Sequence, residues 1–295
     1  MRAKSLLTTV LFWLTITASA TGQSAQELSE LGAESLPGDI IVYYAGEVSR
    51  GEAAEVQRLM EACTARYRHE IPDIPPVTVA ILDSTTWVRL SPAPYGFPHH
   101  NPYVTPVVVL VPARPAAIFS DIGIDPQEAP RFFRLLALHE LGHLLNWAAV
   151  GLDPASVNIA TPWPVPGWYR EFAADYFRFS CLPPDAPPRQ STRWLDSNRP
   201  LYPFLDESDR VHEKQTADGT PYMGTPAYWR NVGWVMGVIG EAARRHHVRL
   251  GDGFLPLLRE QWKRSPAMTT DAVIAEMTES NPDLVLWLKQ MGAIR

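Results

Sequence analysis

Residues 129–151 read APRFFRLLALHELGHLLNWAAVG, and this stretch decides the fold. Pro130 stands before the apolar run, while Gly151 and Pro154 follow it, as is typical of the two ends of a helix. Nearly every position other than the charged, His and Asn residues is apolar, so the sequence predicts a helix that is buried on most sides. The polar pentad HELGH, at residues 139–143, interrupts this apolar helix and needs its own explanation.

Two histidines of the pentad have the spacing of metal ligands. His139 and His143 are four positions apart, so on a helix they lie one above the other and can present both imidazoles to one point. Glu140 follows the first histidine and is expected on the same side of the cleft. Neutral imidazoles suit zinc, but a catalytic zinc site takes three protein ligands and leaves the fourth position to water. The pentad therefore needs a third ligand from elsewhere in the chain.

Glu171 is the candidate for that third ligand. The extended pattern His-Glu-x-x-His-x-x-Gly-x-x-His is excluded, because Asn146 and Ala149 stand where it requires Gly and His. An aspartate ligand within Gly-Thr-x-Asp is also missing downstream. The segment EFAAD, at residues 171–175, instead places Glu171 on a second predicted helix, with Asp175 four residues later on the same face. Glu171 can complete a zinc site with the two histidines.

The two helices together resemble the gluzincin metallopeptidases. Members of this family combine His-Glu-x-x-His with a later helix that carries Glu-x-x-x-Asp or a close variant. The segment VPGWYREFAADYF, at residues 165–177, is similar to the Pro-x-Trp-x-x-Glu-x-x-Ala-x-Tyr form of peptidase-MA-like members. The resemblance covers roughly residues 105–180, and the matching positions are Pro166, Trp168, Glu171, Ala174 and Tyr176.

The resemblance implies a role for each residue of the site. His139, His143 and Glu171 would bind Zn²⁺, and Glu140 would be the general base that takes a proton from the zinc-bound water and passes it to the leaving amine. Asp175 would accept the outer N–H of a ligating imidazole and so fix its tautomer. The strand at residues 107–111 would be the edge strand that pairs with an extended peptide substrate. A Gly-x-Met-x-Asn motif is not found near this strand, which favours an endopeptidase.

Each residue also has an ordinary structural interpretation. The histidines could be core side chains, although a charged Glu140 on so apolar a helix would then cost several kcal/mol. Glu171 could be a solvated acid paired with Arg170 or Arg178, and Asp175 could cap a loop. A second function also stays open, that of a non-catalytic exported protein that binds a peptide or glycan on a metallopeptidase fold. The intact Glu140 favours the enzyme, because a binding protein has no need for a base there.

Other polar residues have no motif around them. Tyr222, Tyr228 and His212 are candidates for stabilising the oxyanion, and none is favoured over the others. His99 and His100 lie in LSPAPYGFPHHNPY, at residues 90–103, where prolines and a glycine predict irregular structure. We expect these two histidines in a solvated loop, at the rim of the cleft at most.

The N-terminus predicts export. Residues 1–20, MRAKSLLTTVLFWLTITASA, combine two early cations, a short apolar run and a small-x-small end, which is typical of a signal peptide cleaved after Ala20. The run is too short to span a bilayer, so we expect a secreted or periplasmic protein with no integral membrane segment after cleavage.

The net charge of −6 gives no basic surface for nucleic acid. Cys63 and Cys181 could form a disulfide or remain two buried thiols. The oligomeric state is not indicated.

The chain as a whole predicts an α+β fold. Residues 21–35 predict a flexible leader. Residues 36–180 predict a zincin-like catalytic region, with strands at 39–46, 75–83 and 105–113 that form a small mixed sheet and with a helix at 51–70. Residues 181–224 are rich in Pro, Asp and Ser and predict an irregular connection. Residues 225–295 predict a helical C-terminal subdomain, whose first helix has Thr225 as its cap and Pro226 in its first turn.

Overall fold

The computed structural model describes residues 25–91, 93, 95–101, 105–114, 122–123, 129–151, 167–182, 225–246, 254–264 and 269–294. The predicted signal peptide and nearly all of the Pro-rich connection lie outside these described residues, as do Tyr222 and His212. The described part is α+β, which confirms the predicted fold class. Among its helices, none has the length and hydropathy that crossing a membrane would require.

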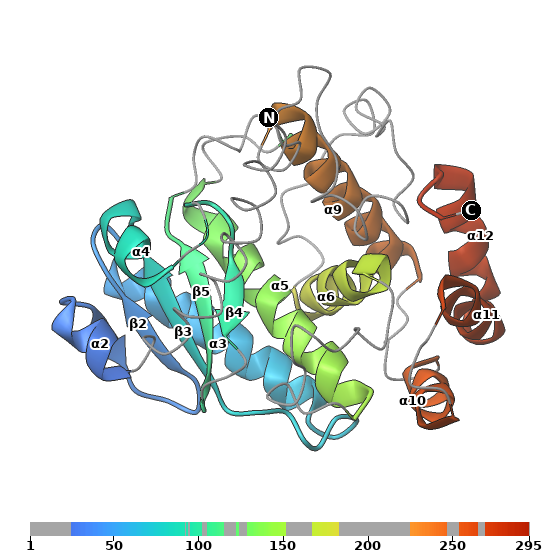
Figure 1. The fold of residues 1–295 in the computed structure, drawn as a ribbon, viewed down its shortest axis with the longest axis horizontal. Coiled ribbons are helices and arrows are strands. Elements are labelled where there is room, and N and C mark those ends of the chain that lie inside the picture. Colours follow the sequence, from blue (N-terminus) through green and yellow to red (C-terminus); the bar gives the residue numbers. More distant parts are fainter. Residues whose placement is uncertain are drawn as a thin grey trace, which may run out of the picture.

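A five-stranded mixed sheet lies on one side of the molecule (Figure 1). The central strands β2 (Ile41–Tyr44), β3 (Val77–Leu82) and β5 (Val107–Pro112) are parallel. The edge strands β1 (Glu34–Leu36) and β4 (His99–Asn101) each pair antiparallel with their neighbour, which gives the order β1-β2-β3-β5-β4.

Helices cover both faces of this sheet. Helices α3 (Arg50–Tyr67) and α5 (Ala129–Ala149) pack on one face, and the short helices α2 (Ala25–Glu30) and α4 (Ser84–Leu90) contribute to a smaller core on the other. Side chains of a strand alternate between the faces, so the odd-numbered valines of β5 join the larger core and its even-numbered residues join the smaller one. Because β5 is buried on both faces, its sequence is a continuous apolar run.

The second half of the described chain is helical. Helix α6 (Gly167–Cys181) packs against α5 and against α9 (Pro226–His246), and α10 (Phe254–Arg264), α11 (Thr270–Ser280) and α12 (Pro282–Met291) follow. Thr225 caps α9 as predicted, since the backbone N–H of Tyr228 donates to its hydroxyl at 3.2 Å. The C-terminal helices α11 and α12 place apolar side chains in the larger core, so they share it with the sheet and α5.

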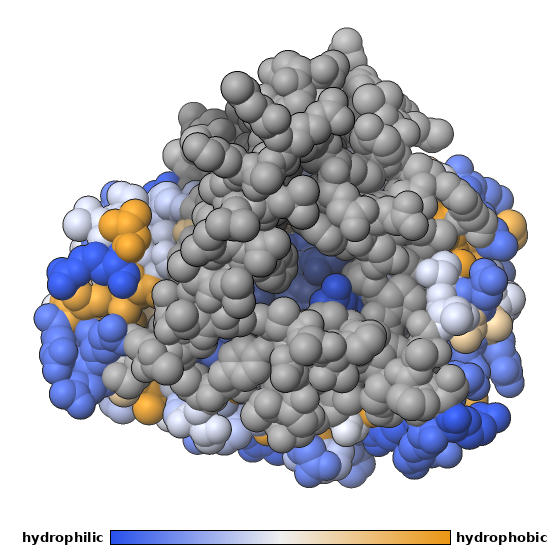
Figure 2. Space-filling view, in the orientation of Figure 1, coloured by the Kyte–Doolittle hydropathy of each residue, from blue (hydrophilic) through white to orange (hydrophobic). Residues whose placement is uncertain are grey.

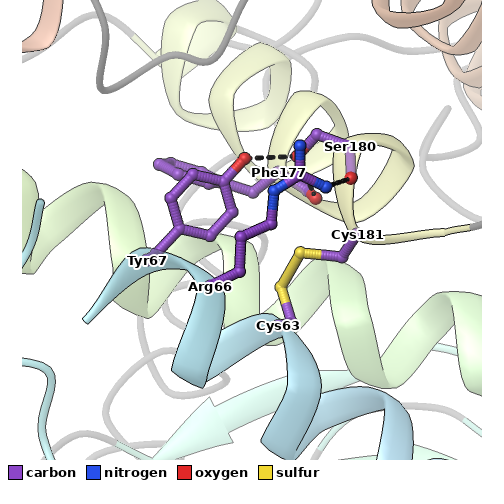
Figure 3. The surroundings of a disulfide bond; sticks show 6 residues. All are labelled: Cys63, Arg66, Tyr67, Phe177, Ser180 and Cys181. Atoms are coloured by element: carbon purple, nitrogen blue, oxygen red, sulfur yellow. Dashed lines mark hydrogen bonds between the residues drawn. A yellow bond between two sulfur atoms is a disulfide. The ribbon is translucent and has the colours of Figure 1, made fainter. Parts of the chain in front are cut away.

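A disulfide joins α3 to the end of α6. Cys63 and Cys181 are bonded with their Cα atoms 5.3 Å apart, which decides between the two states left open by the sequence. Figure 3 shows Cys63, Arg66 and Tyr67 projecting from α3 towards the last turn of α6. Arg66 donates to the backbone carbonyl of Ser180, and the hydroxyls of Tyr67 and Ser180 are hydrogen-bonded. These contacts fix the C-terminal end of α6 on the sheet-covering helix α3.

Three sequence predictions need correction. The predicted flexible leader, residues 21–35, contains regular structure, because α2 and most of β1 lie within it and Leu28 is fully buried against the sheet. The segment at residues 90–103 is not irregular throughout, because residues 99–101 form β4 despite the prolines on both sides. The strand at residues 107–111 is not at the edge, because β4 pairs with its outer side. The edge strand on this side of the sheet is therefore β4, which contains His100.

Candidate metal centre

Two crossing helices bring the predicted site residues together. Helix α5 carries His139, Glu140 and His143, and α6 carries Glu171 and Asp175. Both helices have apolar faces in the larger core, so their polar residues point into the space between α5, α6 and β4. In Figure 2, hydrophilic residues are visible at the place where Figure 1 shows α5 and α6.

The helices approach closely because a glycine lies at their contact. A Cβ atom built on Gly142 would be 2.3 Å from the backbone oxygen of Ala174 and 2.7 Å from its Cα. Any larger residue at position 142 would therefore collide with the backbone of α6. Gly142 lies between the two histidines of α5, and Ala174 lies between the two acids of α6. The close contact between the helices therefore lies where His139 and His143 of α5 face Glu171 and Asp175 of α6.

Three donor atoms form a nearly equilateral triangle. Nε2 of His139 lies 3.2 Å from Nε2 of His143, and Oε2 of Glu171 lies 3.4 Å from the former and 3.6 Å from the latter. Donors about 2.0–2.1 Å from a tetrahedral zinc ion lie about 3.3–3.4 Å from one another. The three distances therefore fit one zinc ion, with one tetrahedral position left over. The side chain of Glu171 is 42% exposed, so the triangle opens towards solvent on this side.

A second acid lies near the histidines but has another partner. The side chains of His139, Glu140 and His143 also offer donor atoms that lie within 4.8 Å of one another. The Oε2 atom of Glu140, however, accepts a hydrogen bond of 2.7 Å from Nδ1 of His100. Glu171 contacts both histidines and Glu140 contacts His100, so Glu171 is the better third ligand and Glu140 remains beside the triangle.

Asp175 hydrogen-bonds the ring of His139 on the side away from the triangle, and Arg178 pairs with Asp175. Oδ1 of Asp175 accepts a hydrogen bond from Nδ1 of His139, which leaves Nε2 of that ring for a metal. Nη2 of Arg178 lies 2.9 Å from the same carboxylate oxygen, and Arg178 is 1% exposed. A buried cation of this kind needs a paired anion, and Asp175 is the one it contacts. Arg178 therefore contacts Asp175 rather than Glu171, and the sequence did not indicate this role.

Burial and neighbouring charges shift the pKa values of these groups. Burial alone would lower the pKa of His139, but the charge and hydrogen bond of Asp175 outweigh it and raise this pKa to about 10. Burial lowers the pKa of His143 to about 4. Burial would raise the pKa of Glu140, but the hydrogen bond from His100 and the nearby imidazoles lower it to about 2. Glu140 therefore stays ionised, as a general base requires.

The charges of the site fit a divalent cation. Three carboxylates, those of Glu140, Glu171 and Asp175, contact imidazole rings here, while one guanidinium, that of Arg178, contacts one of them. With His139 protonated, as its raised pKa implies, the three carboxylates still outnumber the two cations that contact them, Arg178 and His139. A ligating imidazole must be neutral, so losing this proton leaves two negative charges to be balanced. A doubly charged metal ion would balance them. The donor distances and the charges therefore point to the same kind of ligand.

Two of the other candidates, Tyr228 and His99, lie within the described residues and contact aromatic rings. Tyr228 stacks on Phe97, with ring centroids 5.9 Å apart, and contacts Trp229. The ring of His99 lies edge-on to Trp87 on the other face of the sheet. No described contact places Tyr228 or His99 beside the metal ligands.

Comparison of the chain with protein-family models, with curated proteins and with solved structures finds no match.

Proposed function

We propose that this protein is an exported zinc metallopeptidase of the gluzincin type, with a zincin-like catalytic domain, and that it cleaves within peptide chains. The observation that carries the proposal is the triangle of donor atoms from His139, His143 and Glu171, with sides of 3.2, 3.4 and 3.6 Å. The disulfide supports export, because such bonds persist in oxidising compartments.

In the proposed peptide hydrolysis, each residue of the site has a separate role. When bound, zinc acidifies a coordinated water and polarises the substrate carbonyl. Glu140 lies beside the donor triangle as a buried carboxylate, so it accepts the proton of the attacking water and delivers it to the leaving nitrogen. Asp175 keeps the proton of His139 on Nδ1, so that Nε2 stays free to bind the metal. The guanidinium of Arg178 lies 2.9 Å from the carboxylate of Asp175 and pairs with its charge.

The alternative is a non-catalytic protein that binds a peptide or glycan in the same cleft. It has the same metal ligands but no use for an ionised carboxylate beside them. The buried Glu140, with its hydrogen bond from His100, favours the enzyme over the binding protein.

The test measures metal content and hydrolysis on the same samples of the mature chain. We expect about one zinc per chain in the wild type by elemental mass spectrometry, much less in Glu171→Ala, and unchanged zinc in Glu140→Gln. On a mixed peptide library, Glu140→Gln should lose nearly all cleavage, since a general base contributes about 10²–10⁴-fold. Zinc-dependent peptide binding without any cleaved product in the wild type would favour the binding protein. A wild type that binds no zinc would contradict the zinc peptidase.

A further inference from the structure

The edge strand β4 points its two histidines to opposite faces of the sheet. In β4, His100 is paired with Val109 of β5 and His99 with Leu110. Val109 belongs to the core under α5, and Leu110 belongs to the core under α4. The same alternation directs His100 to the α5 side and His99 to the other, where its ring meets Trp87.

His100 contacts α5 beside the metal ligands. Its Nδ1 atom lies 2.7 Å from Oε2 of Glu140, and its ring packs edge-on against Trp147, with centroids 4.9 Å apart. A carboxylate at this site only accepts hydrogen bonds, so Nδ1 of His100 must carry the proton. The side chains of His100 and Glu140 are 14% and 5% exposed, so little water competes for this hydrogen bond.

No other hydrogen-bond donor to Glu140 is found within the described ranges. The imidazoles of His139 and His143 act on this carboxylate through charge alone. A glutamate has three side-chain torsions, and a single charge-assisted hydrogen bond on one oxygen limits them strongly. Holding Oε2 leaves Oε1 as the oxygen that is free to take up a proton.

We propose that His100 is a positioning residue that orients the carboxylate of Glu140 for proton transfer. The proposal rests on the function proposed above. It also connects the general base to the edge strand β4. A residue that acts in this way affects the turnover step, because it leaves the metal ligands and the binding surface in place.

Substitutions of the two histidines test this role. We expect His100→Leu to lower kcat by about 10–100-fold, as loss of supporting hydrogen bonds around metal sites commonly does, with KM and zinc content close to the wild type. His100→Asn should recover most of kcat, because its amide N–H lies near the position of Nδ1. His100→Gln, which places its N–H near the position of Nε2, should not. His99→Leu alters the opposite face of the same strand and serves as the matched control, with kcat close to the wild type.

Melting temperatures test the contact between His100 and Glu140 without any enzymatic turnover. The melting temperatures of zinc-loaded wild type, His100→Leu, Glu140→Gln and the double variant form a cycle. The fall caused by His100→Leu should be smaller in the Glu140→Gln background, since the carboxylate partner is already gone. If the falls in melting temperature caused by His100→Leu and Glu140→Gln are additive, the proposal is overturned. This test does not require that the protein cleaves a peptide.

The outcomes separate the two proposals. A wild type that cleaves no peptide contradicts the proposed function, and the melting cycle then decides the role of His100. A wild type that cleaves, beside a His100→Leu variant with unchanged kcat, overturns the positioning role only. If His100→Leu does not fold, Asn and Gln at this position carry the test, and equal kcat values for these two variants overturn it.

Discussion

Replacing Gly142 by alanine should separate the two helices that carry the proposed metal ligands. The added Cβ would lie 2.3 Å from the backbone oxygen of Ala174, and a relaxed contact needs about 1 Å more. Backbone atoms on both sides form this contact, so no side-chain rotation can relieve it. Helix α6 must therefore move away from α5 by about that amount.

The displacement is large compared with the tolerance of a zinc site. Oε2 of Glu171 lies 3.4 and 3.6 Å from the two imidazole nitrogens, and ligand distances at zinc sites hold to within about 0.2 Å. A shift of about 1 Å thus weakens the third ligand, and we expect Gly142→Ala to lower zinc affinity by about 10–100-fold, as loss of a supporting residue does. Overpacking should also lower the free energy of unfolding of the zinc-free protein by about 1–3 kcal/mol.

Two measurements separate these effects. Urea unfolding of the zinc-free protein reports the packing cost, and chelator competition reports the zinc affinity. Gly51→Ala is the matched control, because a Cβ at Gly51 in the first turn of α3 meets no atom within 4 Å. This control should be neutral or stabilising by up to about 1 kcal/mol. A Gly142→Ala protein with wild-type unfolding and wild-type zinc affinity would refute the close crossing of α5 and α6.

Four further changes have defined outcomes. Asp175→Asn should weaken zinc binding by about 10–100-fold in the same chelator assay, and unchanged affinity would show that its hydrogen bond to His139 has no effect on the metal. Arg178→Met leaves the Asp175 carboxylate buried without its cation, so urea unfolding should report a loss of about 3–5 kcal/mol, and a neutral result would contradict the buried pair. Zinc binding at pH 7 should release about one proton, because the pKa of His139 is raised to about 10 and a ligating imidazole must lose its proton. Affinity then rises with pH up to that pKa, and calorimetry in buffers of different ionisation enthalpy counts the proton, with zero release as the contrary result. Replacing Cys63 and Cys181 together by serine should lower the free energy of unfolding by about 2–5 kcal/mol, and an unchanged urea midpoint would mean that the bond adds no stability.

The helices were predictable because their apolar spacing and their ends agree. The pentad helix was expected at residues 129–151 and is found at Ala129–Ala149, and the second helix expected around Glu171 is found at Gly167–Cys181. The buried strand β5 was predicted from its valines, but its place inside the sheet was not. A strand's sequence reports burial on its faces, whereas its order in the sheet depends on which distant strand pairs with it. For the same reason, Leu28 in α2 gave no sign in the sequence that it would be covered by the sheet.

The site was predictable where its residues share a helix and unpredictable where they do not. The spacing of His139 and His143, and of Glu171 and Asp175, follows from the period of a helix, and the structure brings these four side chains together. Arg178 carried a weak signal, since a charged residue three positions after Asp175 on an apolar helix needs a partner.

His100 carried almost no signal, because a strand of three residues between prolines has the sequence of a loop. Its pairing with Val109 turns its ring towards α5, and a change of register by one residue would bring His99 there instead. Since His99 and His100 are the same kind of residue, the sequence could not tell which would contact Glu140. The identity of the partner of Glu140 is therefore a property of strand register, which only the folded sheet defines.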